Sequence, residues 1–268
     1  GHYDAFIGET VSLIHAPIYL RNREVYDAVL NRPVAEQSEG DPLGELDSQS
    51  HPNWPIEFIP TICPHCGWDL LGEKDTLALI CKNCNSIWRA YGNSLRQMGF
   101  TVVPSENGTA AIHLPFWRLR AELSRIRLDT YGDLRQLANV PRIATREREE
   151  QKLHFWIPGF KIPPHHFLRI SQYATLAQEW GEGEETLPKG PIHPVTLPAR
   201  EAAESIKILA ASLATPPSLV FPWLPRIQVK ITDYRLYYVP FRQSGGDYIQ
   251  PATQIVVNRN ALNLGRLL

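Results

Sequence analysis

The stretch CPHCGWDLLGEKDTLALICKNC, from Cys63 to Cys84, contains every cysteine of the chain. The thiols form two pairs, Cys63 with Cys66 and Cys81 with Cys84, and two residues separate the members of each pair. A C-x2-C turn directs both sulfurs at one point, and two such turns facing each other form a tetrahedral cage of four thiolates, which suits zinc. We therefore predict one structural zinc ion held by Cys63, Cys66, Cys81 and Cys84.

The residues around the two cysteine pairs predict a compact hairpin. Gly67 follows the first pair and Asn85 follows the second, and these residue types most readily adopt the left-handed backbone that such turns need. Between the pairs, residues 68–70 and 76–80 are short apolar runs that we expect to form two strands. The polar residues 71–75 are then the turn that joins the two strands.

From about Ile62 to Trp88 the sequence resembles a zinc ribbon. Similar ribbons occur in RNA polymerase subunits, transcription factors, ribosomal proteins and protein adaptors, and the chain also resembles uncharacterised bacterial zinc-ribbon proteins. The resemblance implies metal binding but no activity. A closed four-thiolate site leaves no position for water or substrate, so the metal is expected to stabilise a segment too short to bury a core of its own. His65, between two ligands, is expected to face solvent.

Length and composition are those of a soluble globular protein. The chain has 268 residues, of which 43% are hydrophobic and 21% are charged, so it is long enough for one large domain or two smaller ones. Its formal net charge of −1 gives no overall basic excess, so nucleic-acid binding would need a local patch. No apolar run approaches the length of a transmembrane helix. Because the cysteines are assigned to a metal and none to disulfides, we expect a reducing, cytoplasmic location.

Three parts are predicted along the chain. They are an N-terminal β-rich segment with a polar linker at 35–53, the ribbon, and an α+β domain, with bounds 1–57, 58–92 and 93–268. Apolar runs bounded by turn residues predict the strands before the ribbon. These strands are residues 11–14, 17–20 and 25–30.

The C-terminal part combines strand and helix signals. Residues 117–124 alternate apolar and polar side chains without a break, which predicts a strand buried on one face. Residues 198–214 start with proline and place small and aliphatic side chains on one face, which predicts an amphipathic helix. A shorter helix is expected at residues 129–140, and residues 244–247 are expected to form a hairpin turn. The predicted fold class is α+β, with antiparallel sheets from a duplicated β unit, a few helices and the four-cysteine ribbon.

A short proline-aromatic motif is the basis for predicting a duplication. IHAPIY at residues 14–19 matches IHLPFW at 112–117, and FWIPGF at 155–160 and YYVPFR at 237–242 are looser copies. Proline cannot donate to a sheet ladder, so each copy is expected on an edge strand or at a bulge. The aromatic residues either fill a core or line a concave surface for a peptide, a partner strand or an apolar ligand. The repeated His15 and His113 are expected to be structural.

Other polar residues are weaker candidates for chemistry. The sequence contains no phosphate-binding glycine loop, no nucleophile elbow and no H-E-x-x-H motif. The adjacent His165 and His166 offer a second metal site, and Asp129 with Asp133 would share a helix face as an acid–base pair. Adjacent histidines point in different directions, however, and this aspartate spacing is common on solvated helices. The sequence therefore favours a protein without catalytic activity.

These features together favour a non-enzymatic scaffold or adaptor that binds a protein partner as a subunit of a larger assembly. The alternative is a nucleic-acid-binding protein that uses the ribbon and its basic and aromatic neighbours. An enzyme whose site is assembled from scattered residues is the third possibility. The residues expected to contact a protein or nucleic-acid partner are Trp68, Lys82, Trp88, Arg89, Arg118 and Arg120.

Overall fold

The computed structural model describes residues 4–7, 10–13, 18–22, 24–28, 30–36, 58–105, 110–140 and 145–267. The chain divides into two compact units, Gly1–Glu57 and Phe58–Leu268. Antiparallel sheets occur in both units and helices in the second, so the predicted α+β class is confirmed. Within the described ranges, no helix combines the length and the apolar character needed to cross a membrane.

The N-terminal unit consists of two small antiparallel sheets. Strands β1 (Asp4–Ile7) and β2 (Thr10–Leu13) form a hairpin, and a second sheet contains β3 (Ile18–Arg21), β4 (Glu24–Asp27) and β5 (Arg32–Glu36). Strand β5 includes two residues that the sequence assigned to the linker. Every side chain of β5 is exposed, so it lacks the apolar alternation that would have identified it. The remainder of the predicted linker, 37–53, lies outside the described residues.

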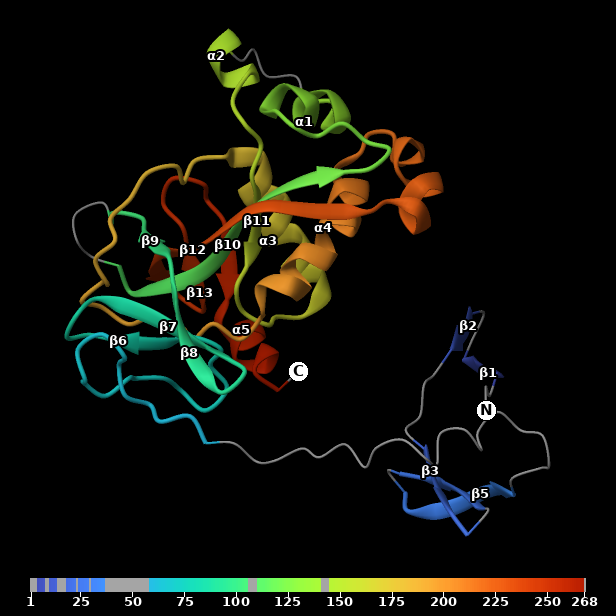
Figure 1. The fold of residues 1–268 in the computed structure, drawn as a ribbon. Helices are drawn as coiled ribbons and strands as arrows, with labels where there is room; N and C mark the ends of the chain where they lie inside the picture. Colours follow the sequence, from blue (N-terminus) through green and yellow to red (C-terminus); the bar gives the residue numbers. More distant parts are fainter. Residues whose placement is uncertain are drawn as a thin grey trace. The chain divides into compact units, whose positions relative to one another are not determined.

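The second unit is organised around two long antiparallel strands (Figure 1). These are β10 (Ile112–Leu123) and β12 (Val229–Ser244), which pair along the whole of β10. The sheet order is β11-β10-β12-β13-β14, and β9 pairs with β12 in parallel. The additional strands are β9 (Phe100–Val102), β11 (Phe155–Pro158), β13 (Asp247–Ile249) and β14 (Val256–Asn258). Residues 245 and 246 turn the chain between β12 and β13, as predicted, and Gly245 has a φ of +57°.

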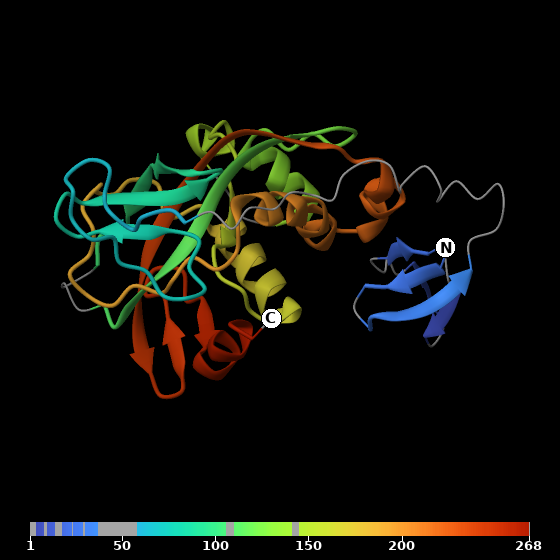
Figure 2. The same cartoon turned by 60° about the horizontal axis from the view of Figure 1, so that its bottom comes forward.

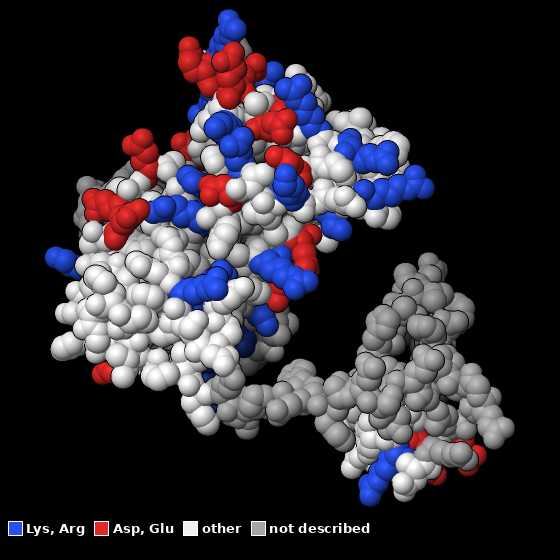
Figure 3. Space-filling model, in the orientation of Figure 1, with Lys and Arg blue, Asp and Glu red and all other residues white. Residues whose placement is uncertain are grey.

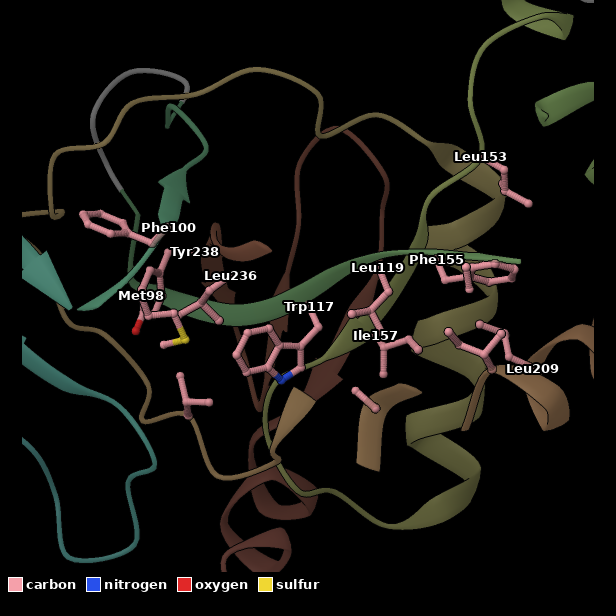
Figure 4. Packing of buried hydrophobic residues seen from close by; sticks show 14 of the residues in the cluster. Met98, Phe100, Trp117, Leu119, Leu153, Phe155, Ile157, Leu209, Leu236 and Tyr238 are labelled. Atoms are coloured by element: carbon pink, nitrogen blue, oxygen red, sulfur yellow. The ribbon is translucent and has the colours of Figure 1, made fainter. Parts of the chain in front are cut away.

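Both faces of this sheet are buried. Successive residues of β10 point to opposite sides, and each side contributes to an apolar cluster. Trp117 and Leu119 belong to one apolar cluster, and Leu114 and Phe116 belong to another. Figure 4 shows the first cluster, in which Trp117 from β10 packs near Leu236 of β12. The predicted alternation is confirmed over the second half of β10, but its first half is buried on both sides.

In the part of the chain that the structure describes, five α-helices cover the sheet or extend from it. They are α1 (Tyr131–Ala138), α2 (Arg146–Glu149), α3 (Pro164–Ala177), α4 (Ala199–Leu213) and α5 (Arg259–Gly265). Two 3₁₀ helices, η3 (Pro217–Leu219) and η4 (Phe221–Arg226), follow α4. Apolar residues of α4 join the cluster around Trp117, whereas those of α3 and α5 join the cluster around Phe116. Figures 1 and 2 show α1 and the ribbon at opposite ends of β10.

The helix starts follow simple capping chemistry. The predicted helix at 198–214 is confirmed, although Pro198 is the N-cap residue rather than the first helical residue. The predicted helix at 129–140 is α1, and it begins with a capping box in which Thr130 accepts from the backbone of Asp133 and the Asp133 side chain accepts from the backbone of Thr130. Asp133 is therefore committed to holding the helix start, not to acid–base chemistry with Asp129.

Three copies of the proline-aromatic motif lie side by side in the sheet, on β11, β10 and β12. The expectation of edge strands and bulges is wrong for Pro115, which lies on the central strand opposite Tyr238, with the register irregularity only at Arg120. The pairing between β10 and β11 ends at Phe116, next to Pro115. The carbonyl of Pro115 accepts from the backbone N–H of Gly159, and the N–H that proline lacks is not needed for a ladder bond at this position. The copy at 14–19 lies partly outside the described residues.

The aromatic residues of these copies fill the core. Phe116 and Phe241 are 0% exposed and Trp156 is 2% exposed. Phe116 packs edge-on against Trp180 with ring centroids 4.9 Å apart. These contacts support the packing interpretation and not an open aromatic surface.

Candidate metal centre

The four cysteines lie close enough to hold one metal ion. Their sulfur atoms all lie within 4.8 Å of one another. Sγ of Cys63 is 3.6 Å from Sγ of Cys84, and Sγ of Cys66 is 3.5 Å from Sγ of Cys81, far beyond the ~2.05 Å of a disulfide bond. A tetrahedron with metal–sulfur bonds of about 2.3 Å has edges of about 3.8 Å. The donor set therefore fits a tetrahedral thiolate site.

Left-handed residues shape both cysteine turns, as predicted. Gly67 has a φ of +73° and Asn85 has a φ of +53°. The backbone N–H of Gly67 donates to the carbonyl of Cys63 at 2.9 Å, which closes the first turn. His65 is exposed at the tip of this turn, in agreement with the expectation that it faces solvent.

The strand pairing inside the ribbon differs from the prediction. The ribbon sheet has the order β6-β7-β8, formed by Leu79–Cys81, Ser86–Tyr91 and Ser94–Met98. The predicted strand at 68–70 does not pair with the second one: Asp69 forms an isolated bridge with Ile62, and only the adjacent Leu71 forms one with Ile80. The backbone N–H of Leu77 instead donates to the carbonyl of Val195 in the body, at 2.7 Å. The local pairing is thus reduced to the two bonds between Leu71 and Ile80, and a long-range bond is added at Leu77.

Ser86 connects the cysteines to the apolar interior of the ribbon. Its side chain is buried, and its Oγ lies 3.0 Å from Sγ of Cys84 and 3.7 Å from Sγ of Cys63. The indole N–H of Trp88 donates to the same Oγ at 2.8 Å. This arrangement leaves the Ser86 hydroxyl free to donate to a sulfur, the kind of outer contact that orients a metal ligand.

The thiols are arranged so that they cannot all ionise without a compensating cation. Burial opposes ionisation of Cys63, but backbone N–H groups of Cys66 and His65 prevail and lower its pKa to about 6. For Cys84, the hydrogen bond with Ser86 favours the thiolate, but burial and the neighbouring thiols raise its pKa to about 12. A bound metal ion would remove this conflict, because it stabilises the thiolates together.

The residues predicted to contact a partner are divided between solvent and core. Trp68 is 61% exposed, and Lys82 is exposed as well. Trp88 is only 7% exposed, and it packs with Leu70 and the buried cysteines. Trp88 is therefore not available to stack on a base. Trp88 is buried because alternate residues of β7 point to the same side, and Trp88 therefore faces the cysteines like Ser86.

The three predicted arginines are partly committed to other groups. Arg118 donates to the hydroxyl of Tyr237 at 2.8 Å and pairs with Asp233 at 3.5 Å, so its guanidinium does not form an open basic patch. Arg89 is half-buried, 3.5 Å from the hydroxyl of Tyr234, and Arg120 is also half-buried. The six residues predicted as contacts thus do not share one exposed surface.

The ribbon is fixed to the body through contacts that the sequence did not indicate. Ile87 and Met98 belong to the main apolar cluster of the body, whereas Trp88, next to Ile87, packs with the cysteines. Arg266, near the C-terminus, forms a two-pronged pair with Asp75 at 2.6 and 2.8 Å and also pairs with Glu73 at 2.7 Å. Because 191 positions separate Arg266 from Asp75, no local pattern could have revealed this contact.

The other candidate sites gain no support from the structure. Within the described residues, the four cysteines are the only group of three or more metal-ligating side chains close enough to hold an ion. The rings of His165 and His166 lie 4.1 Å apart at the start of α3 without a third ligand. His113 is buried in the core, and His15 lies outside the described residues.

Comparison with known proteins adds no relative. No protein-family model, curated protein or solved structure matches this chain. The function is therefore argued from the geometry of the site and of the surface around it.

Proposed function

We propose that the chain is a non-enzymatic adaptor in which one zinc ion holds the ribbon in shape and the ribbon binds a protein partner. Zinc is the metal best suited to four thiolates in a tetrahedral arrangement. Such a closed site has no position for substrate, which favours a structural role. Reduced thiols are needed to bind the metal, and they fit a protein that works in the cytoplasm as part of a larger assembly.

The observation that carries this proposal is the apolar surface of the ribbon. Ile62, Trp68 and Leu71 flank the first cysteine turn and are 52%, 61% and 48% exposed. In Figure 3 the visible face of the ribbon, at the lower left of the larger body, is mostly uncharged, whereas charged side chains crowd the opposite end. Exposed apolar side chains are typical of protein–protein interfaces, in which tryptophan is often the main anchor.

The test compares ribbon variants as baits in cells of the source organism. Trp68→Ser and Ile62→Ser should each remove a stoichiometric partner that co-purifies with the wild-type chain, while zinc content stays at one ion per chain. Tyr173→Ser, which alters a side chain on α3 that is 58% exposed, is the matched control and should keep the partner. A wild-type chain that is monomeric in native mass measurements and brings no partner would contradict the proposal.

A nucleic-acid partner is the second candidate, because one side of the ribbon carries basic side chains. Lys82 and Arg96 are exposed, and the guanidinium of Arg96 lies 3.5 Å from the ring centre of Tyr91. Together with Trp68, these groups could hold a single strand through phosphate contacts and stacking. Fluorescence anisotropy with single-stranded DNA and RNA oligonucleotides tests this alternative. It requires binding that weakens steeply with salt and that Lys82→Gln and Trp68→Ser both reduce.

A further inference from the structure

A cavity at the seam between the ribbon and the body has the size of a small-molecule site. Its volume is about 360 Å³, within the ~300–1,000 Å³ range of ligand pockets. One wall comes from the ribbon and the other from the loop that runs past β10. The residues that give the cavity its apolar lining include Leu71, Ala78, Ile80, Ile192 and Val195.

Tyr238 gives this apolar cavity a polar group. Its side chain is 1% exposed, yet it lines the cavity, and its hydroxyl forms no hydrogen bond with another residue among those described. Figure 4 shows the hydroxyl oxygen of Tyr238 at the ribbon end of the cluster, beside Met98. Burial raises the pKa of this phenol, so the hydroxyl keeps its proton and remains a donor. This hydroxyl borders the cavity, so it can donate to an acceptor on a molecule bound there.

Charged groups from the ribbon also line the cavity, and they differ in how they are satisfied. The carboxylate of Glu73 already pairs with Arg266 at 2.7 Å. Lys82 lines the same cavity and forms no ion pair with the described residues. The imidazole of His193, also in the lining, contacts the carbonyl of Pro194 at 2.9 Å, and burial lowers its pKa, so it stays neutral. Lys82, which is exposed, is the cationic side chain of the lining that is available to an anionic group on a ligand.

The geometry points to a binding site for a small amphipathic carboxylate in this cavity. The carboxylate binds Lys82, the apolar part of the molecule lies between Ile80 and Val195, and an oxygen at its far end accepts a hydrogen bond from Tyr238. Ligand sites usually combine apolar walls with a few polar groups that fix the orientation of the ligand. The cavity shares Leu71 with the proposed protein-binding surface, but ligand binding in it does not depend on a protein partner.

The experiment measures the binding of three related probes to the zinc-loaded full chain by isothermal titration calorimetry and by ¹H–¹⁵N NMR. Para-hydroxyphenylacetate has all three features, phenylacetate lacks the far oxygen, and para-hydroxyphenylethanol lacks the charge. We expect the first probe to bind most tightly and to shift the amide signals of residues 71–82 and 190–195. Lys82→Gln should weaken its binding by roughly tenfold and Tyr238→Phe by about fivefold, from the usual contributions of charged and neutral hydrogen bonds.

Matched variants separate the site from general effects on the ribbon. Lys74→Gln removes an exposed charge elsewhere on the ribbon that does not line the cavity. Tyr237→Phe removes a hydroxyl that donates to the carbonyl of Gly181 on the other face of the sheet. Both should bind the probe like the wild-type chain. The proposal is overturned if no probe binds at millimolar concentration, if the alcohol binds as tightly as the carboxylate, or if Lys82→Gln and Tyr238→Phe leave binding unchanged.

Discussion

Substitution of Ser86 by alanine tests whether the buried hydroxyl supports the metal site. The change removes one oxygen that lies 3.0 Å from Sγ of Cys84 and accepts from the indole of Trp88 at 2.8 Å. It leaves all four thiol ligands in place and adds no volume to the ribbon core. Any loss of metal affinity then reports the contacts of this hydroxyl with Cys84 and Trp88.

The expected losses of zinc affinity and of folding free energy follow from the two contacts that Ser86→Ala removes. Removal of a group that orients a metal ligand usually lowers metal affinity by about 10–100-fold, which corresponds to about 1.4–2.7 kcal/mol. The indole N–H of Trp88, which is 7% exposed, also loses its acceptor, and an unpaired buried donor costs about 1–3 kcal/mol of folding free energy. The affinity loss should therefore be accompanied by a less stable ribbon.

The assay is competition for zinc with a chromogenic chelator, which gives the dissociation constant of each variant. Ser94→Ala is the matched control, because the Ser94 hydroxyl is exposed and donates only to the carbonyl of Tyr91. Trp88→Phe removes the indole donor but keeps the contact between Ser86 and Cys84, so its zinc affinity should stay closer to that of the wild-type chain. If Ser86→Ala binds zinc within twofold of the wild-type value, the hydroxyl does not support the thiolates and the reasoning fails.

Three further outcomes are expected. Metal removal by a chelator should shift the fluorescence of Trp88 to the red, whereas Trp68, already 61% exposed, should report little, and an unchanged spectrum would mean that the ribbon holds without metal. Burial raises the pKa of Asp133, but hydrogen bonds from the backbone N–H groups of Thr130 and Asp129 outweigh burial and lower it. The capping energy is therefore fully present above about pH 4, the ordinary pKa of an aspartate, and it is lost as the pH falls through the lowered pKa. Asp133→Asn should therefore reduce the unfolding free energy by about 1 kcal/mol at pH 7, and the difference in urea midpoint should shrink toward zero in acid. Arg266→Gln should speed hydrogen exchange in the ribbon turn while costing less than about 1 kcal/mol of global stability, since Arg266 and Asp75 are about one-third exposed and Glu73 about half exposed.

The local chemistry of the site could be predicted from sequence because its determinants are close together in the chain. Ligand type and spacing identify the metal centre, and Gly67 and Asn85 identify the left-handed turns that shape it. The exposed His65 follows from the same turn geometry. Periodicity was sufficient for α4 and for the second half of β10 for a similar reason, since each pattern extends over many consecutive residues.

The long-range contacts could not be predicted because nothing local encodes them. The bond from Leu77 to Val195 redirects a strand that would otherwise have paired within the ribbon. Pro115 lies on a central strand only because the β11 ladder ends beside it, which depends on a partner far along the chain. Burial of Trp88 depends on which face of β7 meets the cysteines, and that face is fixed by tertiary packing.

The alternation of side chains along β7 couples the metal centre to the rest of the molecule. Ser86 and Trp88 face the cysteines, while Ile87, between them, is 0% exposed in the main cluster of the body. The same ribbon supplies one wall of the cavity that contains Tyr238. We expect metal loss to loosen β7 and so to move that wall, while the β10–β12 pair stays intact. Occupancy of the cavity and occupancy of the metal site should therefore favour each other, because each stabilises the same placement of the ribbon.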